Sequence, residues 1–437
     1  MRIKSIGSWA GFRNSLSYIF LLSLLTIGMG CSGQGGNSSE GIDSTFGNGG
    51  AAQTPVNSGD DTGRALAIQS DGKILVAGCS VLDSFCKFGL VRYQEDGSLD
   101  AEFGTNGRVT TSVGPGEDGA YAVALQSDGK IVAAGATFDG SNKDIALLRY
   151  NSDGTLDPTF GAGSGIVTSA IGMGDDSANA VAIQPDGKIL VAGCSFVGNF
   201  CKFMIARYDA EGNLDVSFGS SGSTITSIGS GEDGAYGMAL QSDGKIVVAG
   251  ATFNGTDKDI ALIRYNADGS LDTSFGNGDG IVQTAVAMGN DQANGMAIQE
   301  DGKIVIAGCA VLGSNCKVVV ARYDPDGTLD ASFSGGMVTT SVGNGEDGAY
   351  GVAILPDGKI AIAGATFNGS DRDFLLIRYN PEGSLDSTFA EEGVAQLSVG
   401  EGEDFANGIA IDSDGRLVSA GTAFNGANQD FAAVRYR

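Results

Sequence analysis

The tripeptide Asp-Gly-Lys returns along this chain at an almost constant interval, and this repeat constrains the fold more than any other feature. Its aspartate occurs at Asp71, Asp128, Asp186, Asp243, Asp301, Asp357 and Asp414, and the last copy reads Asp-Gly-Arg. The steps between copies are 57, 58, 57, 58, 56 and 57 residues. A constant period of this length is typical of solenoids and of radial arrays, in which each unit packs only against its neighbours. Seven such units fill nearly all of the 437 residues.

The second unit shows how one repeat is built. Small and apolar residues alternate over 119–126, and the Asp128-Gly129 pair that follows is a strong signal for a two-residue hairpin turn. Apolar stretches at 131–136, 144–150 and 165–170 complete the unit. The pattern predicts four antiparallel strands per unit. Seven such units predict an all-β, seven-bladed β-propeller, and the 71 glycines fit a chain with many tight turns.

The two ends of the repeat region complement each other. The last unit stops at Arg437 after its third strand, whereas residues 42–56 carry the connection and the fourth strand that this unit lacks. A closed ring would use this match to remove exposed sheet edges, so the N-terminal strand is predicted to complete the C-terminal blade. The alternative is a linear solenoid, which needs polar caps at both ends, and the sequence has none. We therefore expect residues 42–437 to form the propeller.

The N-terminal stretch has the pattern of an export signal. Three basic residues precede the apolar run Leu16–Ile27, which is too short for a comfortable membrane span, and this predicts a signal peptide over residues 1–30. The run ends in a Gly-Met-Gly-Cys sequence that resembles a bacterial lipoprotein signal, in which the cysteine becomes the lipidated first residue. Cys31 is therefore the expected lipidation site, and residues 31–41 are the expected lipid-attachment segment and flexible tether. The alternative is an ordinary cleaved signal and a secreted protein.

The other six cysteines form three pairs with the same spacing. They are Cys79 and Cys86, Cys194 and Cys201, and Cys309 and Cys316. Each pair lies between two apolar strands, so the spacing predicts two cysteines opposite each other at the mouth of a hairpin, joined by a disulfide. A metal site is the alternative, but two thiols without histidine or a second pair make a poor ligand set. Disulfides require an oxidising compartment, which again predicts an exported protein.

Two further motifs recur along the chain, with some variation between copies. The second strand reads Asp-Gly-Lys-Ile, apolar residues and Ala-Gly, and the third strand ends in Arg-Tyr, followed by Asp-Gly and then Leu-Asp-x-Ser-Phe-Gly. This pattern resembles the delta-60 repeat family of bacterial β-propellers over residues 42–437. The resemblance implies a propeller and a surface or envelope setting, and it implies no particular reaction.

Each unit contains one arginine and one aspartate at matching positions. The arginines are Arg92, Arg149, Arg207, Arg264, Arg322, Arg378 and Arg435, and the aspartates are Asp100, Asp157, Asp215, Asp272, Asp330, Asp386 and Asp43. An arginine and a carboxylate can form a bidentate pair. We expect one structural Arg–Asp pair per blade, clamping the connection between the third and fourth strands, because function rarely needs seven copies of one pair.

Acidic residues also mark the start of each first strand. They are Asp61, Asp118, Asp176, Asp233, Asp291, Asp347 and Asp404, each preceded by a second acidic residue or an asparagine. A propeller would place these residues around one mouth of the ring, where they are candidate ligands for calcium or a cationic partner. The structural interpretation is that each aspartate binds backbone amides of its own turn. The Asp-x-Asp-Gly segments, such as 324–330, lack the full carboxylate spacing of a calcium loop and predict turns held by their own side chains.

Charge and composition exclude several classes of function. The chain has no histidine, which removes histidine metal ligands and Ser-His-Asp hydrolases. Its net charge is −26, and its basic residues recur once per unit instead of clustering, so no nucleic-acid partner is expected. Six of them are interpreted as one recurring hairpin position, namely Lys87, Lys143, Lys202, Lys258, Lys317 and Arg372.

No nucleophile–base pair or phosphate loop stands out. The sequence therefore predicts a non-enzymatic binding or scaffold module at the bacterial cell envelope, as an outer-membrane lipoprotein whose partner is a protein or a glycan and whose only membrane contact is the lipid. The expected cofactor is none, with calcium as the alternative. Two other functions stay open: a hydrolase or lyase that uses carboxylates on polysaccharide or peptide, and a calcium-dependent adhesin.

Overall fold

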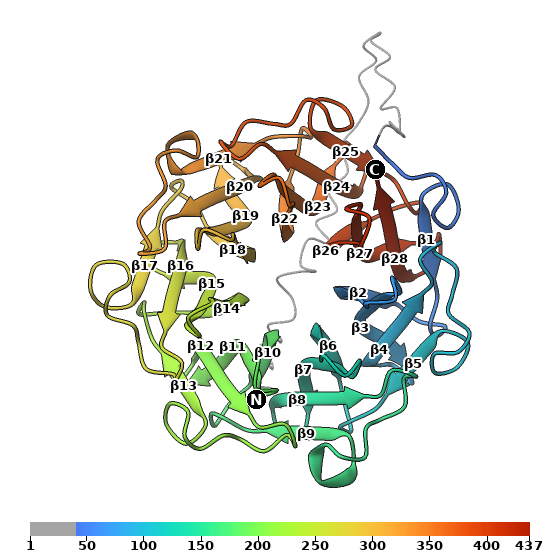
Figure 1. Ribbon diagram of the computed structural model, residues 1–437, viewed down its shortest axis with the longest axis horizontal. Coiled ribbons are helices and arrows are strands. Elements are labelled where there is room, and N and C mark those ends of the chain that lie inside the picture. Colours follow the sequence, from blue (N-terminus) through green and yellow to red (C-terminus); the bar gives the residue numbers. More distant parts are fainter. Residues whose placement is uncertain (1–40) are drawn as a thin grey trace, which may run out of the picture. The chain divides into compact units, whose positions relative to one another are not determined.

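A computed structural model describes residues 41–437, in which 28 strands form seven antiparallel sheets of four strands each. The sheets follow one another around a ring, with the first strand of each sheet nearest the axis (Figure 1). This confirms the seven-bladed, all-β propeller. The predicted signal peptide, Cys31 and all of the predicted tether except Gly41 lie outside the described residues. Within residues 41–437, no helix is long and apolar enough to cross a membrane.

The strands of the blades have nearly constant bounds. The first strands are β2 (Asp61–Ile68), β6 (Asp118–Leu125), β10 (Asp176–Ile183), β14 (Asp233–Leu240), β18 (Asp291–Ile298), β22 (Asp347–Ile354) and β26 (Phe405–Ile411). The second strands are β3 (Ile74–Leu82), β7 (Ile131–Phe138), β11 (Ile189–Val197), β15 (Ile246–Phe253), β19 (Ile304–Leu312), β23 (Ile360–Phe367) and β27 (Leu417–Phe424).

The outer half of each blade repeats in the same way. The third strands are β4 (Phe85–Tyr93), β8 (Lys143–Tyr150), β12 (Phe200–Tyr208), β16 (Lys258–Tyr265), β20 (Asn315–Tyr323), β24 (Arg372–Tyr379) and β28 (Gln429–Tyr436). The fourth strands are β5 (Arg108–Thr111), β9 (Ile166–Ser169), β13 (Ser223–Thr226), β17 (Ile281–Thr284), β21 (Met337–Thr340), β25 (Val394–Leu397) and β1 (Ala51–Thr54). Two short 3-10 turns, η2 (Gly161–Gly163) and η3 (Ser334–Gly336), lie in the connections.

Glycine is required at two places in the blade. In the Asp-Gly-Lys turn, Gly72 has a φ of 82° and the Lys73 amide donates to the Asp71 carboxylate, so the motif closes the hairpin between the first two strands. In the second strand, a β-carbon on Gly78 would lie 1.9 Å from the Thr62 carbonyl oxygen. The Ala-Gly of each second strand therefore allows the first strand to approach at its bulge, where the register shifts.

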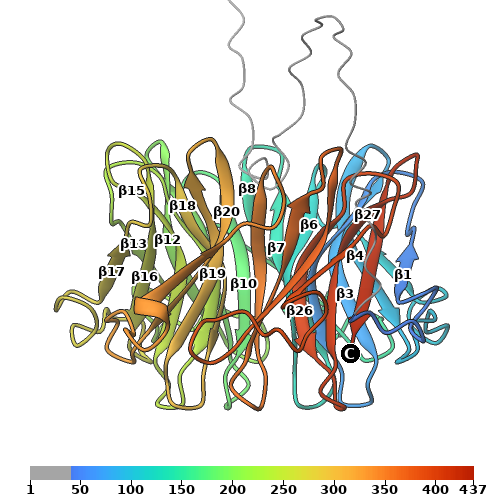
Figure 2. The same ribbon diagram turned by 90° about the horizontal axis from the view of Figure 1, so that it is seen from above.

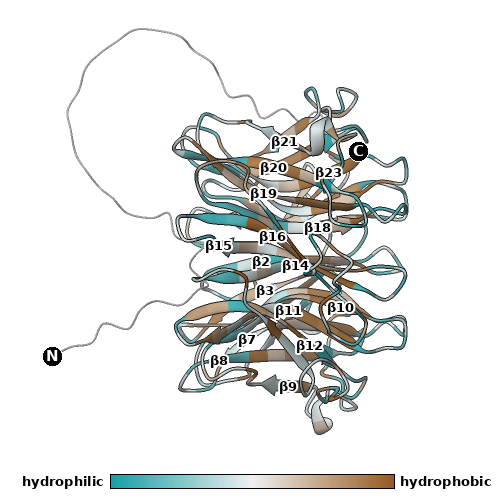
Figure 3. Cartoon of the chain, turned by 90° about the vertical axis from the view of Figure 1, so that its left-hand side faces the viewer, coloured by the Kyte–Doolittle hydropathy of each residue, from teal (hydrophilic) through white to brown (hydrophobic). Residues whose placement is uncertain are grey.

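The hydrophobic core lies between neighbouring blades. One cluster joins Val132 and Leu147 of the second blade to Ile189 and Tyr208 of the third. The seven tyrosines of the Arg-Tyr pairs are among the largest fully buried side chains. Hydrophobic colour follows the strands and hydrophilic colour gathers at the turns (Figure 3). Because each blade lies between two others, both faces of its sheet are covered, and its middle strands are apolar on both sides.

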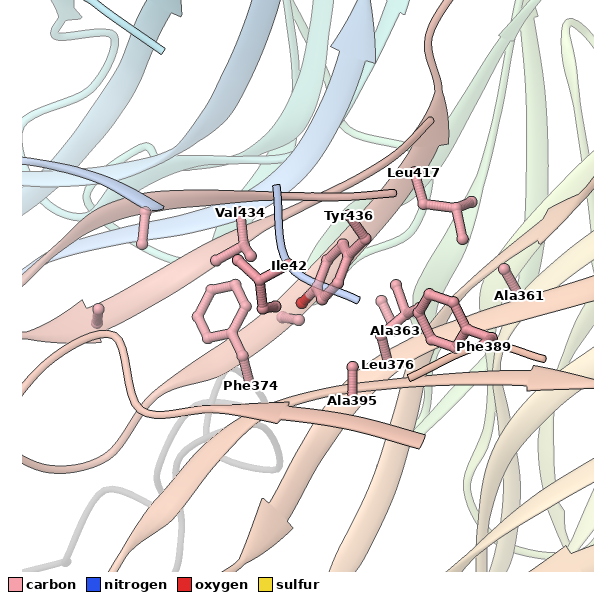
Figure 4. Packing of buried hydrophobic residues seen from close by; sticks show 13 residues of the cluster. Ile42, Ala361, Ala363, Phe374, Leu376, Phe389, Ala395, Leu417, Val434 and Tyr436 are labelled. Atoms are coloured by element: carbon pink, nitrogen blue, oxygen red, sulfur yellow. The ribbon is translucent and has the colours of Figure 1, made fainter. Parts of the chain in front are cut away.

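The ring closes by strand complementation. β1 pairs antiparallel with β28, from Ala51 opposite Val434 to Thr54 opposite Phe431, and so completes the seventh sheet. Ile42 packs beside Val434 and Tyr436 (Figure 4). The prediction that the N-terminal strand completes the C-terminal blade is confirmed.

Candidate functional site

The loops of the propeller gather at the two ends of the ring (Figure 2). One end carries the hairpins between second and third strands, together with the loops that lead from each blade to the first strand of the next. We call this end the hairpin face, and these crossing loops the interblade loops. The Asp-Gly-Lys turns and the connections between third and fourth strands lie at the other end, the turn face. We call the aspartates at the start of the first strands, from Asp61 to Asp404, the strand-start aspartates. Asp176 pairs with Ser195 next to Cys194, which places the strand-start aspartates and the cysteine hairpins on the same face.

The seven strand-start aspartates lie inside their own loops. Asp118 is 2% exposed, and its carboxylate accepts hydrogen bonds from the Val113 amide at 3.0 Å, the Gly114 amide at 3.0 Å and the Thr137 hydroxyl at 2.6 Å. Asp61, Asp176, Asp233, Asp291, Asp347 and Asp404 are likewise buried and accept amides of their own interblade loops. The structure therefore does not bring these carboxylates together as one ring around the opening. A buried aspartate needs hydrogen-bond donors, and the nearest backbone amides lie within its own loop.

A lysine of the preceding blade neutralises three of these aspartates. The Lys87 ammonium lies 2.9 Å from the Asp118 carboxylate, 2.7 Å from the Gly116 carbonyl oxygen and 3.3 Å from the Gly114 carbonyl oxygen. Lys202 and Lys317 make the same contacts with Asp233 and Asp347. These ion pairs link the first blade to the second, the third to the fourth and the fifth to the sixth.

The interpretation of six basic residues as one hairpin position is wrong. Lys87 lies opposite Ser80, whereas Lys143 lies opposite Phe138 and corresponds to Cys86. Side chains alternate across a strand, so this offset of one residue puts the two sets on opposite faces of their sheets. Lys143 and Lys258 reach Glu117 and Glu232. Arg372 contacts Glu346 and Glu403.

On the turn face, the arginine and the aspartate of every blade meet. Arg92 donates to Asp100 at 2.7 Å, its guanidinium lies 4.4 Å from the Phe103 ring centre, and it also donates to the Ser152 carbonyl of the next blade. The other pairs repeat this contact, at 2.6 to 2.9 Å, in Arg149–Asp157, Arg207–Asp215, Arg264–Asp272, Arg322–Asp330, Arg378–Asp386 and Arg435–Asp43. Each arginine thus stacks on the phenylalanine of its own connection. Six of them also donate to a backbone carbonyl of the neighbouring blade, namely Arg92, Arg149, Arg207, Arg264, Arg322 and Arg435.

The sequence missed a second cation at this aspartate. The lysine of the Asp-Gly-Lys turn also reaches it, and Lys130 lies 3.1 Å from Asp157. Burial raises the pKa of Asp157, but hydrogen bonds from Thr159, Lys130 and Arg149 outweigh burial and hold the pKa well below its usual range. The constant spacing from Asp-Gly-Lys to Leu-Asp was the signal for this contact.

The Asp-x-Asp-Gly segments form turns held by their own side chains. The Asp326 carboxylate accepts the Thr328 amide at 2.9 Å and the Thr328 hydroxyl at 2.7 Å. Asp324 binds the Lys303 ammonium at 2.8 Å. Across residues 41–437, no group of three acidic, cysteine or histidine side chains has an arrangement that could hold a metal ion.

The three predicted disulfides are present, but their cysteines are not directly opposite. Cys79 lies across from Phe88 and Cys86 from Val81, so each bridge spans a diagonal of the hairpin with a Cα–Cα distance of 5.4 to 5.6 Å. Both cysteines of a pair lie on the same face of the sheet, and the strand twist brings this diagonal within bonding distance.

The cysteine hairpins expose apolar side chains, which the sequence reasoning did not single out. At their tips lie Leu82, Phe85, Val197, Phe200 and Leu312, which are 38 to 49% exposed, and the neighbouring interblade loops carry the fully exposed Met173 and Met288. We call these seven residues the apolar hairpin residues. They belong to the first, third and fifth blades, and all lie on the hairpin face. An apolar residue at the tip of a hairpin, where a polar turn is expected, was the available signal.

Six segments match the family model described as a domain of unknown function (DUF5122) β-propeller. They are residues 69–103, 126–160, 184–218, 241–275, 299–333 and 355–389. Each runs from the Asp-Gly-Lys turn to the phenylalanine of Leu-Asp-x-Ser-Phe, so the matches contain the arginine and the aspartate of six blades. These matches support a β-propeller repeat family. The model's description assigns no activity to this propeller.

Solved structures resemble the propeller in fold only. Virginiamycin B lyase from Staphylococcus aureus is 12% identical, with 88% of this chain and 98% of that chain covered and a TM-score of 0.48. The polysaccharide lyase Uly1 is 11% identical (91% and 98% covered, TM-score 0.47), and Sqt1 from Chaetomium thermophilum is 13% identical (88% and 97% covered, TM-score 0.42). No curated protein matches the propeller in sequence. These similarities are too distant to assign a reaction or a partner.

Proposed function

We propose that the chain is a non-enzymatic binding or scaffold module of the bacterial cell envelope that holds a protein or glycan through its hairpin face. The observation that carries the proposal is the position of the apolar hairpin residues, which lie on hairpins closed by disulfides and on the interblade loops beside them. Phe85 is 44% exposed and Phe200 is 42% exposed, each one residue before a bridged cysteine. A disulfide limits the freedom of the hairpin before binding, which lowers the entropy lost when a partner docks.

The charged residues of the propeller support a binding role over a catalytic one. The seven strand-start aspartates are buried and accept backbone amides, and the seven arginines bind the connections of the turn face. A carboxylate-based enzyme acting on polysaccharide or peptide would need acids that reach solvent at one blade. The strand-start aspartates, on which that alternative depended, do not offer this.

A double substitution on the hairpin face tests the proposal. We expect Phe85→Ser/Phe200→Ser to keep the fold and to reduce retention of the envelope partner at least tenfold, because exposed aromatic anchors each contribute on the order of 1–4 kcal/mol to an interface. The measurement is quantitative pulldown of protein and glycan from envelope extract, with purified wild type as bait. The control is Val216→Ser, a 76% exposed apolar residue in a connection on the turn face. Equal retention of the partner by the wild type and the double variant would show that the hairpin face does not bind it.

The proposed cellular location is tested separately. The proposal places the chain at the outer membrane through a lipid on Cys31. We expect radiolabelled palmitate to label the wild type and to leave Cys31→Ser unlabelled in the envelope fraction. Labelling of both proteins to the same extent would refute lipidation at this cysteine, and the hairpin-face experiment would be unaffected.

A further inference from the structure

The strand position that holds a lysine in three blades holds an aspartate in the other four. Lys87 lies opposite Ser80, and in the corresponding place of the second blade Asp144 lies opposite Thr137. The lysines of this position are Lys87, Lys202 and Lys317, and the aspartates are Asp144, Asp259, Asp373 and Asp430. The cation that neutralises a strand-start aspartate at three interfaces is thus replaced by a second acid at the others.

Hydrogen bonds between adjacent blades place these acids side by side. The backbone amide of Lys143, the residue before Asp144, donates to the side-chain carboxylate of Asp175, the residue before Asp176, at 2.9 Å. The same amide contact joins Lys258 to Asn290 and Gln429 to Asp60, and the Asp404 amide donates to the Arg372 carbonyl at 2.7 Å. We call the four resulting pairs the acidic interfaces. They are Asp144 with Asp176, Asp259 with Asp291, Asp373 with Asp404, and Asp430 with Asp61.

The acidic interfaces contain buried carboxylate oxygens that accept no hydrogen bond. Both Asp144 and Asp176 have such an Oδ1 atom, and Asp291, Asp373 and Asp430 have one each. Asp291 is fully buried, Asp430 is 2% exposed and Asp373 is 3% exposed. At Asp291 the reason is visible in the sequence, because Ala310 stands where the first blade has Ser80, whose hydroxyl binds Asp61 at 2.6 Å. A buried charged oxygen without a donor is costly, so each of these atoms requires a hydrogen-bond donor or a cation.

The electrostatics of the pairs agree with their geometry. Burial, followed by the nearby Asp259 and Asp257 charges, raises the pKa of Asp291. Burial raises the pKa of Asp430, and the Asp61 charge raises it further, although a hydrogen bond from Asn425 opposes both. A buried carboxylate beside a second carboxylate attracts either a cation or a shared proton.

We propose that each acidic interface binds one divalent cation, preferentially Ca²⁺, in the place that the lysine ammonium takes at the other three interfaces. At the lysine interfaces that place is lined by a carboxylate oxygen and two backbone carbonyl oxygens, from Asp118, Gly114 and Gly116. Carboxylate and carbonyl oxygens are the ligands that Ca²⁺ prefers. The acidic interface adds the second carboxylate that balances the second charge of the ion.

The number of protein ligands predicts modest affinity. The interblade loop before Asp176 has the same length as the loop before Asp118, so Gly172 and Gly174 correspond to Gly114 and Gly116. The Gly174 carbonyl already accepts the Asn142 side chain at 2.7 Å. Two carboxylates and one or two carbonyls fall short of the six to eight oxygens of a Ca²⁺ shell, and waters would complete it. We therefore expect a Kd of about 0.1–1 mM, as in extracellular calcium modules.

Calcium titration of the full chain tests the inference. After removal of metal with a chelator, we expect CaCl2 at pH 7 to give saturable heat in calorimetry with four sites per chain, and to raise the melting temperature by several degrees. No saturable heat and no change in melting temperature would overturn the proposal. A melting temperature that rises on acidification to pH 5 but not with Ca²⁺ would show that the pairs share protons instead, and would also overturn it.

Substitutions that convert one kind of interface into the other locate the calcium sites. We expect Asp144→Lys to bind one Ca²⁺ fewer, since the lysine should bind Asp176 as Lys87 binds Asp118. The combined substitution of Asp144, Asp259, Asp373 and Asp430 by lysine should abolish the calcium effect. Conversely, Lys87→Asp should add a fifth site. Unchanged stoichiometry in both Asp144→Lys and Lys87→Asp would place the calcium elsewhere and refute the assignment. Because the sites lie between blades, these results are independent of the hairpin-face pulldown.

Discussion

A chain that begins at Asn57 is expected to lose the cooperative fold of the propeller. Residues 42–56 supply β1, and their removal exposes the edge of β28 along Phe431 to Val434. It also removes the fully buried Phe46 and leaves Arg435, which is 4% exposed, without its carboxylate partner. Loss of a buried aromatic side chain costs about 3–5 kcal/mol, and breaking a buried ion pair costs about as much. Together these losses approach the total stability of a typical domain, which is about 5–15 kcal/mol.

The measurement is thermal unfolding followed by circular dichroism and calorimetry. The truncated chain is expected to aggregate or to melt without a sharp transition. A circular permutant provides the control, because it begins at Asn57 and carries residues 41–56 after Arg437 through a short Gly/Ser linker. The Arg437 amide donates to the Gly41 carbonyl at 2.8 Å, so the linker spans a very short distance. The permutant should recover the wild-type transition. A truncated chain that melts like the wild type would show that β1 does not close the ring.

The sequence predicted the ring because its information is repeated seven times. A single Asp-Gly pair predicts one hairpin, but the same turn at every 57 or so residues defines the repeat unit, and the incomplete last unit predicts the closure of the ring. The disulfides followed from the same regularity. The errors came where a local register decides the result: a shift of one residue separates Lys87 from Lys143, and the cysteines of a pair meet on a diagonal. Sequence spacing gives strand order, whereas the facing of side chains depends on the register of each pair.

The candidate sites were harder to predict than the fold. The strand-start aspartates were recognised as a set, but the sequence does not show whether a carboxylate faces solvent or its own loop. The acidic interfaces depend on contacts between different blades, such as Asp430 with Asp61, which lie at opposite ends of the chain. The alternation of lysine and aspartate was visible in the sequence, but its meaning depends on which aspartate of the next blade each residue faces.

The stability of the metal-free propeller is expected to peak near pH 5 and to fall steeply below pH 4. The aspartates of the arginine pairs, such as Asp157, Asp215, Asp272, Asp330 and Asp386, have a pKa below their usual value of 3.8. A carboxylate whose pKa is lower in the folded state stabilises the fold above its unfolded pKa, and this stabilisation is lost as the pH falls toward the folded pKa. Several such groups repeat around the ring, so their losses add up in the same window.

Asp404 acts in the opposite direction above pH 4. Burial raises its pKa to about 6, against hydrogen bonds from Gly400, Phe424 and Val399, and the Asp373 charge raises it further. The folded state therefore binds more protons than the unfolded state between pH 3.8 and about 6, and the stability rises as the pH falls through this window. Guanidinium unfolding at half-unit steps from pH 3 to pH 8, after removal of metal, measures both limbs of the profile.

Two substitutions separate the two limbs of the profile, which are the rise in stability from pH 7 to pH 5 and the fall below pH 4, called the acid limb. Asp404→Asn keeps the size of the side chain and cannot titrate, so the gain in stability between pH 7 and pH 5 should shrink while the acid limb stays. Asp157→Asn should instead reduce the acid limb and lower the stability at pH 7, because Arg149 and Lys130 lose their shared carboxylate. A wild-type stability that stays constant from pH 7 down to pH 3 would contradict both assignments. Since Asp404 belongs to an acidic interface, 10 mM Ca²⁺ should flatten its limb and leave the acid limb unchanged, because the bound cation favours the ionised carboxylate.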